Sequence, residues 1–238
     1  MSMDKSLQDS DLFELRHKWK ETRSNVRFYT VIFIIVMLFL LVGSFFTSNF
    51  GFVQVDGRSM VNTLWDGEYL LSYRMWSTKQ LKRGDVIVVY VGDYPEIQAE
   101  NAGKKELEKT KYLIKRLIAL EGDIVRCEDG QISICYAGTY DENTPREEYV
   151  FEPLDESGYA YYDSYETKMH YDFKEEYVVE SGEIFFLGDN RGNSLDSRYN
   201  EGYSHLDRLY KAKDVTAIVP DWAINHQDVI RKLLLWNK

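Results

Sequence analysis

One uncharged segment near the N-terminus constrains this chain more than any other feature of its sequence. Residues 28–46 read FYTVIFIIVMLFLLVGSFF, nineteen residues without a charged side chain. At ~1.5 Å per residue, a helix of this length nearly crosses the ~30 Å hydrocarbon core of a bilayer. The sequence therefore predicts a transmembrane anchor at residues 28–48.

A cleaved secretory leader is the alternative interpretation of this segment. The apolar part of such a leader is usually about 7–15 residues long and follows a short basic start. Here 27 residues precede the apolar run, and the sequence FFTSNF at 45–50 offers no clean A-x-A cleavage site. We therefore expect a retained anchor.

The basic residues on either side of the anchor predict its orientation. Six Lys or Arg residues precede it, whereas Arg58 is the only one in the eighteen residues that follow. Cytoplasmic flanks carry the excess of positive charge. Residues 1–27 are therefore predicted to lie in the cytoplasm and residues 49–238 outside the cell membrane, which the chain crosses once. The outer segment (238 − 48 = 190 residues) is long enough for one domain with its own core.

Composition excludes several classes of protein. The formal net charge of the 238-residue chain is −10, and an acidic chain repels phosphate backbones, so no nucleic-acid partner is expected. Hydrophobic residues make up 44% and aromatic residues 15%, which excludes a mostly disordered chain. Two cysteines and four scattered histidines provide no zinc-binding spacing.

The outer segment reads mainly as short strands. Apolar runs next to turn residues predict strands, and Asp129-Gly130 is a strong signal for a two-residue hairpin. The predicted strands lie at 69–73, 86–91, 112–120 and 183–187, with the hairpin within 126–134. Residues 222–236 have the pattern of an amphipathic helix that packs on the domain or contacts lipid.

Residues 139–182 differ in composition from the rest of the outer segment. They contain thirteen acidic and three basic residues, and the difference (13 − 3 = 10) equals the net negative charge of the chain. Because eight tyrosines accompany these charges, we expect a surface β insertion with tyrosines packed on one face. A calcium site is the alternative, although no D-x-D-x-D-G loop is present.

The two cysteines flank the predicted hairpin turn. If Glu128 pairs with Gln131, Cys127 lies opposite Ile132, and Cys135 points to the other face of the ribbon. A disulfide would require a different register. We therefore predict two free or buried thiols.

The first segment that can carry chemistry is Gly57-Arg58-Ser59-Met60-Val61-Asn62-Thr63-Leu64. Gly57 would allow a substrate backbone to approach Ser59 closely. The segment is not a G-x-S-x-G nucleophile elbow, because residue 61 is Val. A serine near a glycine is usually a turn residue, so this segment needs support from elsewhere.

The second segment is the predicted strand that contains Lys115. Alternation places Leu113, Leu117 and Ala119 on the same face as Lys115. Burial among apolar neighbours lowers the pKa of a lysine, and a neutral lysine can serve as general base for a serine hydroxyl. The alternative is an edge-strand lysine whose amine reaches solvent.

The third segment is Gly188-Asp189-Asn190-Arg191-Gly192-Asn193-Ser194-Leu195-Asp196-Ser197-Arg198. Dense turn-forming residues and alternating charges at the end of a strand predict a loop that hydrogen-bonds to itself. Such a loop can support a nearby site rigidly. A plain solvated turn is the alternative interpretation.

Together these segments resemble the type I signal peptidases, membrane-anchored Ser-Lys endopeptidases that cut leaders from exported proteins. Residues 57–64 are similar to the family pattern G-x-S-M-x-P-T-L, and 83–88 to R-G-D-[IV]-V-V. Residues 115–123 resemble K-R-[VI]-x-G-x-P-G-D, and 188–198 match G-D-N-R-x-N-S-x-D-S-R throughout. The resemblance covers residues 28 to about 220. It implies a bent, mostly antiparallel β-sheet catalytic domain with an inserted β region.

The resemblance also implies roles for individual residues. Ser59 would be the nucleophile and Lys115 its general base, and the Ser59 N–H would form part of the oxyanion hole. Ser194 resembles the hydroxyl that orients the lysine amine. The other implied roles are a supporting ion pair, two residues that hold the loop and two that bind substrate: Asp196 with Arg198, Asp189 with Arg191, and Gly57 with Met60.

The chain departs from the family pattern at a few positions. Asn62 replaces the proline, and Ala119 and Glu121 replace a glycine and a second proline. The aromatic residue expected two positions before the lysine stands three before it, as Tyr112. The loss of the first proline loosens the turn after Ser59 and alters substrate range. A dedicated pathway, such as pilus assembly, is therefore an alternative to bulk secretion.

We predict an endopeptidase that removes signal peptides from exported precursors at the bilayer surface, without a metal or cofactor. A competing interpretation is a related assembly factor that holds exported subunits without cutting them. A self-cleaving Ser-Lys repressor is a remote third, because the chain has a membrane span and no DNA-binding head.

Overall fold

The structure is a computed structural model of the whole chain. It describes residues 3–94, 97–98, 101–105, 109, 111–163, 176–198, 210–227, 229 and 232. The chain divides into two compact units, Met1–Asn49 and Phe50–Lys238. Residues 164–175 of the acidic insertion and most of 228–238 lie outside the described part.

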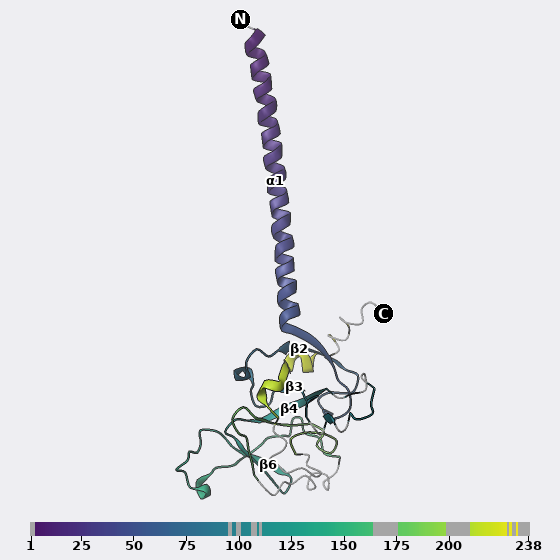
Figure 1. The fold of residues 1–238 in the computed structure, drawn as a ribbon, viewed down its shortest axis with the longest axis vertical. Helices are drawn as coiled ribbons and strands as arrows, with labels where there is room; N and C mark the ends of the chain where they lie inside the picture. Colours follow the sequence, from purple (N-terminus) through teal and green to yellow (C-terminus); the bar gives the residue numbers. More distant parts are fainter. Residues whose placement is uncertain are drawn as a thin grey trace. The chain divides into compact units, whose positions relative to one another are not determined.

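The first unit is a single helix, α1 (Met3–Asn49), drawn in purple to blue in Figure 1. Its stretch Arg16–Asn49 is long and apolar enough to cross a membrane. The helix contains the predicted anchor and begins well before it, so part of the predicted cytoplasmic segment is also helical. The side chains of the apolar stretch are exposed, as a helix surrounded by lipid requires.

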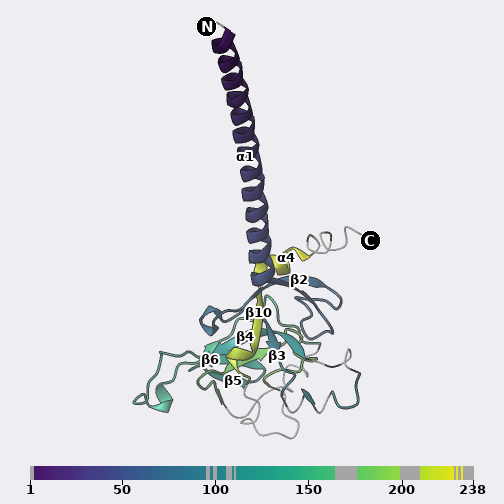
Figure 2. The same ribbon diagram turned by 45° about the horizontal axis from the view of Figure 1, so that its top comes forward.

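The second unit is built on a six-stranded antiparallel sheet with the order β1-β2-β10-β3-β4-β9. Figure 2 shows β10, β3 and β4 together in this unit. The strands are β1 (Phe50–Gln54), β2 (Tyr69–Arg74), β3 (Val86–Tyr90), β4 (Tyr112–Leu120), β9 (Ile184–Leu187) and β10 (Val215–Val219). The four strands predicted from apolar runs are confirmed, whereas β1 and β10 were not predicted.

A second antiparallel sheet has the order β7-β6-β5-β8. Its strands are β5 (Ile124–Glu128), β6 (Gln131–Cys135), β7 (Glu152–Pro153) and β8 (Tyr177–Val178). The acidic insertion supplies β7 and β8, so it is partly β structure, as predicted. Together the two sheets make this a mostly β protein with an inserted β region.

The predicted hairpin joins β5 to β6 in the predicted register. Asp129 and Gly130 have φ of 50° and 69°, the left-handed pair that a tight two-residue turn requires. Cys127 pairs with Ile132, while Cys135 pairs with Ile124. Both cysteines are buried and free, which confirms the prediction of two unbridged thiols.

The strand β9 joins the hydrophobic cores of the two sheets. Phe186 packs in a cluster with Ile87, whereas Phe185 packs with Val125 of the second sheet. All four side chains of β9 are buried, although it is the last strand in its sheet. Burial of this kind contributes roughly 1.5–3 kcal/mol per large apolar side chain. The strand is therefore a rigid support for the loop at 188–198.

One prediction about β4 was wrong at its C-terminal end. Leu113 and Leu117 pack in the same cluster, as the alternation predicts, but Ile118 and Ala119 both pack in the cluster of the second sheet. The pairing of β4 with β9 shifts register between Leu117 and Ala119. This irregularity breaks the alternation, so Ala119 does not share the face of Lys115.

Short helices complete the described part of the second unit. The helix α4 (Asp221–Asn225) begins one residue before the predicted helix at 222–236, most of whose remainder after residue 227 lies outside the described residues. Three single-turn 3-10 helices also occur: η1 (Thr78–Gln80), η3 (Arg146–Glu148) and η5 (Ala212–Asp214).

Candidate active site

Ser59 lies in the connection between β1 and β2. The strand ladder continues one step beyond β1, because Val55 and Glu68 are joined by a backbone hydrogen bond of 2.8 Å. Beyond that point the chain turns, and the amides of Thr63 and Leu64 both donate to the carbonyl of Met60. Met60 and Leu64 are buried in the core. Ser59 is thus presented, half-buried, on a turn that two core side chains hold in place.

Lys115 approaches Ser59 from the middle of β4. Its Nζ donates hydrogen bonds to Ser59 Oγ at 2.8 Å and to the Ile114 carbonyl at 3.0 Å. Only 2% of Lys115 is exposed to solvent. The predicted pair is therefore within hydrogen-bonding distance, and its amine is shielded from water.

Burial also changes the protonation of Lys115. Desolvation lowers the pKa of its amine from an ordinary value of 10.5 to about 8, against the opposing charges of Asp196 and Asp189. At mildly alkaline pH a large fraction of Lys115 is therefore neutral. A neutral amine this close to a hydroxyl can accept its proton.

The residue after Lys115 connects β4 to the loop at 188–198. Arg116 pairs with Leu187 at the end of β9, which brings its guanidinium next to Asp189. Its Nε and Nη2 donate to the two carboxylate oxygens of Asp189 at 2.8 and 2.7 Å. The hydroxyl of Thr63 donates to the same carboxylate at 2.5 Å. Asp189 thus links β4, its own loop and the turn that follows Ser59.

The predicted ion pair of Asp196 and Arg198 is present and buried. Arg198 Nη2 lies 2.9 Å from Asp196 Oδ2, which also accepts a hydrogen bond from the Gly188 amide at 3.0 Å. Burial alone would raise the pKa of Asp196, but the Arg198 charge and these hydrogen bonds hold it below its usual value. The carboxylate therefore stays ionised near Lys115.

Ser194 is half-buried, and its buried hydroxyl lies close to the Asp196 carboxyl and helps to lower the pKa of that group. In the described part of the chain its hydroxyl makes no hydrogen bond of normal geometry, either to Lys115 or to another group. Its implied role in orienting the lysine amine stays a prediction.

Asn190 fastens the same loop to the backbone of the Ser59 segment. Its amide donates to the carbonyl of Ser59 at 2.9 Å, and its side-chain Nδ2 donates to the carbonyl of Arg58 at 3.1 Å. These two bonds fix the plane of the peptide groups that carry Ser59. Asn190 was not singled out in the sequence, because neither bond has a local sequence signal.

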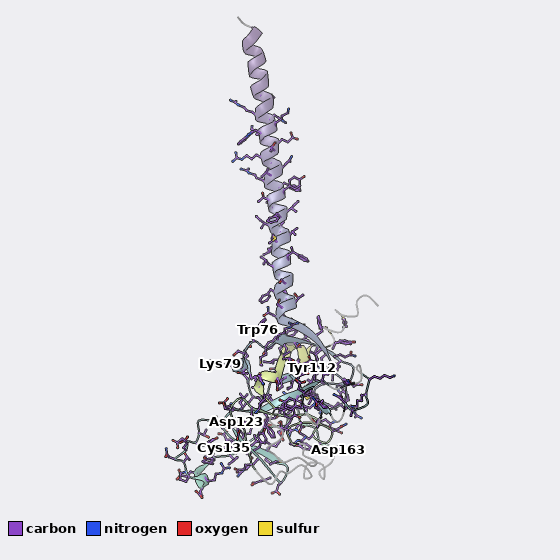
Figure 3. All side chains as sticks on the ribbon, viewed as in Figure 1. Trp76, Lys79, Tyr112, Asp123, Cys135 and Asp163 are labelled. Atoms are coloured by element: carbon purple, nitrogen blue, oxygen red, sulfur yellow. The ribbon has the colours of Figure 1, made fainter. Side chains whose placement is uncertain are left out.

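A cavity of about 330 Å³ opens beside the pair. One wall comes from residues 53–56 at the end of β1 and just after it, and the other from residues 112–115 of β4. Tyr112, labelled in Figure 3, lines the cavity at the N-terminal end of β4, and Lys109 lies nearby. Two segments of extended backbone therefore border a groove that leads to Ser59.

The two residues predicted to bind substrate differ in position. Met60 is buried in the core and lines the cavity, whereas Gly57 is outside the cavity lining. Gly57 has φ of 87° and donates its amide to Asp66, so the turn before Ser59 requires a glycine. Among the described residues no group of three or more His, Cys, Asp or Glu side chains could hold a metal ion.

Comparison with known proteins decides the family. The sequence model of the family described as signal peptidase, peptidase S26, matches residues 25–216. The chain belongs to this family. It is therefore a serine peptidase, and hydrolysis of a peptide bond is the chemistry that its site has to perform.

Individual members of the peptidase S26 family are similar over most of the chain. Signal peptidase I of Bacillus licheniformis is 33% identical over 179 residues, which cover 75% of this chain and 80% of that protein. Signal peptidase I U of Bacillus subtilis is 28% identical and covers 74% of this chain and 81% of that protein. A solved signal peptidase I structure from Enterococcus faecalis is 22% identical with a TM-score of 0.30, covering 60% of this chain and all of that one.

Proposed function

We propose that this peptidase S26 member removes signal peptides from exported precursor proteins, with Ser59 as nucleophile and Lys115 as general base. The observation that carries the proposal is the hydrogen bond of 2.8 Å between Nζ of the buried Lys115 and Ser59 Oγ. The lowered pKa of Lys115, about 8, supports it, because a base must be unprotonated to accept the serine proton.

The reaction follows from this pair. Neutral Lys115 accepts the proton of Ser59 while Oγ attacks the scissile carbonyl carbon. The resulting ammonium donates that proton to the leaving amine, which departs with the mature protein. Lys115 then takes a proton from water, which attacks the ester carbonyl on Ser59, and it returns that proton to Ser59 Oγ as the signal peptide leaves.

A backbone donor is available for the oxyanion of the tetrahedral intermediates. Within the described residues the Ser59 N–H has no hydrogen-bond partner in the protein. A free amide on the nucleophile itself is well placed to donate to the developing negative charge, and removal of one such donor typically costs ~10²–10³ in kcat. Gly57 has no side-chain hydroxyl, so a second hydrogen-bond donor to the oxyanion has to come from another residue.

The groove beside Ser59 fits an extended substrate. Its two walls, residues 53–56 and 112–115, offer backbone to a strand that adds between them. Ser59 and Lys115 also line this groove, and a small-x-small stretch would place its last residue at Ser59. Met60 contributes to the floor of the groove, and Gly57 gives the turn that presents Ser59.

The anchor would bring the peptidase to its substrates. The apolar part of α1 is taken to span the cell membrane at residues 28–48, with residues 1–27 in the cytoplasm and the catalytic domain outside. The apolar segment of an exported precursor lies in the same bilayer. The substitution of Asn62 for the family proline makes a dedicated pathway, such as pilus assembly, an alternative to bulk secretion.

A cleavage assay tests the proposal. The purified full chain in detergent micelles is mixed with a precursor whose signal peptide ends in Ala-x-Ala, and the product is identified by mass spectrometry. The wild type is expected to release the signal peptide, and Ser59→Ala is expected to leave the precursor intact. Binding of the precursor without cleavage by the wild type would support the assembly-factor alternative instead.

A further inference from the structure

The acidic insertion contacts the loop that carries the supporting residues of the site. Within residues 139–182, the segment 154–162, here called the strap, lies along the loop at 188–198. The amide of Tyr161 donates to the carbonyl of Asp189 at 2.7 Å, and the amide of Arg191 donates to the carbonyl of Tyr161 at 2.9 Å. Tyr161 and Asn190 thereby form a parallel bridge. The insertion is therefore more than a surface extension of the second sheet.

The strap also supplies the counter-charge of a buried arginine. The side chain of Arg191 is 0% exposed, and its guanidinium pairs with Glu156, which is only 11% exposed. Among the described residues no other acidic side chain forms an ion pair with Arg191. Tyr162 accepts a further hydrogen bond from Arg191 Nη1 at 3.1 Å. Removal of one member of a buried ion pair leaves an uncompensated charge, which is strongly unfavourable.

A tyrosine of the strap covers a second guanidinium group. The Tyr159 ring centroid is 4.2 Å from Cζ of Arg116, the residue that follows Lys115 and forms the bidentate pair with Asp189. The same ring centroid is 6.0 Å from Cζ of Arg191. A guanidinium over an aromatic face is held by the ring quadrupole and shielded from water. Tyr159 therefore closes one side of the Arg116–Asp189 pair.

The loop transmits these contacts to the reacting serine. Arg191 Nε donates to the carbonyl of Gly188 at 3.1 Å. The side chain of Arg191 therefore holds the first residue of the loop that contains it. Asn190, between Asp189 and Arg191, donates to the backbone carbonyls of Arg58 and Ser59. A shift of Arg191 therefore moves the residue that holds the Ser59 peptide group.

We propose that Glu156 and Tyr159 are positioning residues of this peptidase, which hold Arg191 and Arg116 so that Asn190 and Lys115 keep Ser59 in its reactive position. The proposal rests on the proposed function of Ser59 and Lys115. It assigns the acidic insertion a part in catalysis without direct contact with substrate. Positioning errors of about 1 Å can cost ~10²-fold in rate, so the strap is expected to affect kcat and not substrate binding.

The first experiment substitutes Glu156→Gln, with Glu147→Gln as the matched control in the same insertion. Glu147 is exposed on η3. Within the described part of the chain, its side chain forms no hydrogen bond or ion pair with the loop at 188–198. With the full chain in micelles and the Ala-x-Ala precursor, Glu156→Gln is expected to lower kcat at least tenfold and to change KM less than threefold. Glu147→Gln is expected to match the wild type. Normal kcat in folded Glu156→Gln, or a loss confined to KM, overturns the proposal.

The second experiment separates positioning from folding. Tyr159→Phe keeps the ring over Arg116 and is expected to retain kcat within threefold, whereas Tyr159→Ala is expected to lose at least tenfold with KM nearly unchanged. Equal loss in both variants, or no loss in Tyr159→Ala, overturns the proposal even if Glu156→Gln does not fold. Failure of the proposed function is recognised separately, because Ser59→Ala would then cleave as well as the wild type.

Discussion

Lys115 Nζ and Ser59 Oγ lie 2.8 Å apart although 56 positions separate the two residues in the chain. The contact joins a turn after β1 to the middle of β4, and three strands of the sheet separate β1 from β4. The distance suits proton transfer, and the burial of Lys115 favours the neutral amine that such a transfer needs. The chemical consequences of this relationship can be measured in several independent ways.

Replacement of the lysine should remove the base and leave the fold intact. Lys115→Met has a similar length and suits the apolar surroundings, so we expect a folded protein whose kcat falls ~10²–10⁴-fold. Lys79→Met is the control, because Lys79 is exposed on η1 and is not among the residues that line the cavity at Ser59. Steady-state cleavage of the precursor measures both. Equal turnover in Lys115→Met and Lys79→Met would contradict a role for Lys115 as base.

The activity should rise with pH through the pKa of Lys115. Only the neutral amine accepts the Ser59 proton, so kcat/KM should increase about tenfold per pH unit below the pKa. It should level off above a midpoint of about 8. A pH series of initial rates at low substrate concentration measures the midpoint. A rate that is flat from pH 6 to pH 9 would argue against a lysine base.

The same pKa makes a prediction about stability. The folded-state pKa of Lys115, about 8, is lower than its ordinary value of 10.5. Between these two pKa values the unfolded chain binds more protons at this site, so the stability of the folded protein rises with pH across this window. Below the window, the burial of the charged amine destabilises the folded protein to its full extent. The total is about 3 kcal/mol, since one pKa unit corresponds to about 1.4 kcal/mol.

A comparison of two proteins isolates this contribution. We subtract the free energy of unfolding of Lys115→Met from that of the wild type. This difference should increase by about 3 kcal/mol, in favour of the folded wild type, as the pH rises from 7 to 11. Other titrating groups are common to both proteins and cancel in the difference. Denaturant unfolding in micelles at several pH values measures it. A constant difference would mean that Lys115 titrates normally in the folded state.

The sequence was sufficient for the elements whose signals are local. Apolar runs next to turn residues located β2, β3, β4 and β9, and the positive φ of Asp129 and Gly130 is what the Asp-Gly pair predicts. The first strand was missed because β1 follows the helix directly, so no turn separates it from the helix. The alternation failed at Ala119 because a register shift against β9 has no sequence signal.

The candidate site also contains residues that the sequence predicts and contacts that it does not. Ser59 and Lys115 were singled out because motifs of known type surround them, and the structure brings both to one cavity. The contacts of Asn190 with Ser59 and of Glu156 with Arg191 could not be predicted, since each depends on how distant segments pack. The composition of residues 139–182 suggested a surface β insertion with tyrosines packed on one face. The buried ion pair shows that at least one of these carboxylates has a specific partner.

The closeness of the loop to Ser59 leads to a last prediction, at Gly188. A Cβ added there would lie 2.6 Å from the Ser59 carbonyl oxygen and 2.1 Å from Ser194 Oγ. The first of these atoms belongs to the backbone and cannot rotate away, so Gly188→Ala has to displace either the loop or the Ser59 peptide group. We expect a loss of stability of ~1–3 kcal/mol from overpacking. The displacement of Ser59 should also lower kcat ~10–100-fold.

Gly158→Ala is the matched control for this substitution. Gly158 lies in the strap, its φ is not positive, and a Cβ there would meet nothing within 4 Å. We expect that variant to equal the wild type in cleavage rate and to be as stable or slightly more stable, because alanine restricts the unfolded chain. Thermal unfolding and precursor cleavage, measured on both variants, give the comparison. Full activity in Gly188→Ala would show that the position of the Ser59 carbonyl is not critical for the reaction, because the loop or the serine must then have moved without effect.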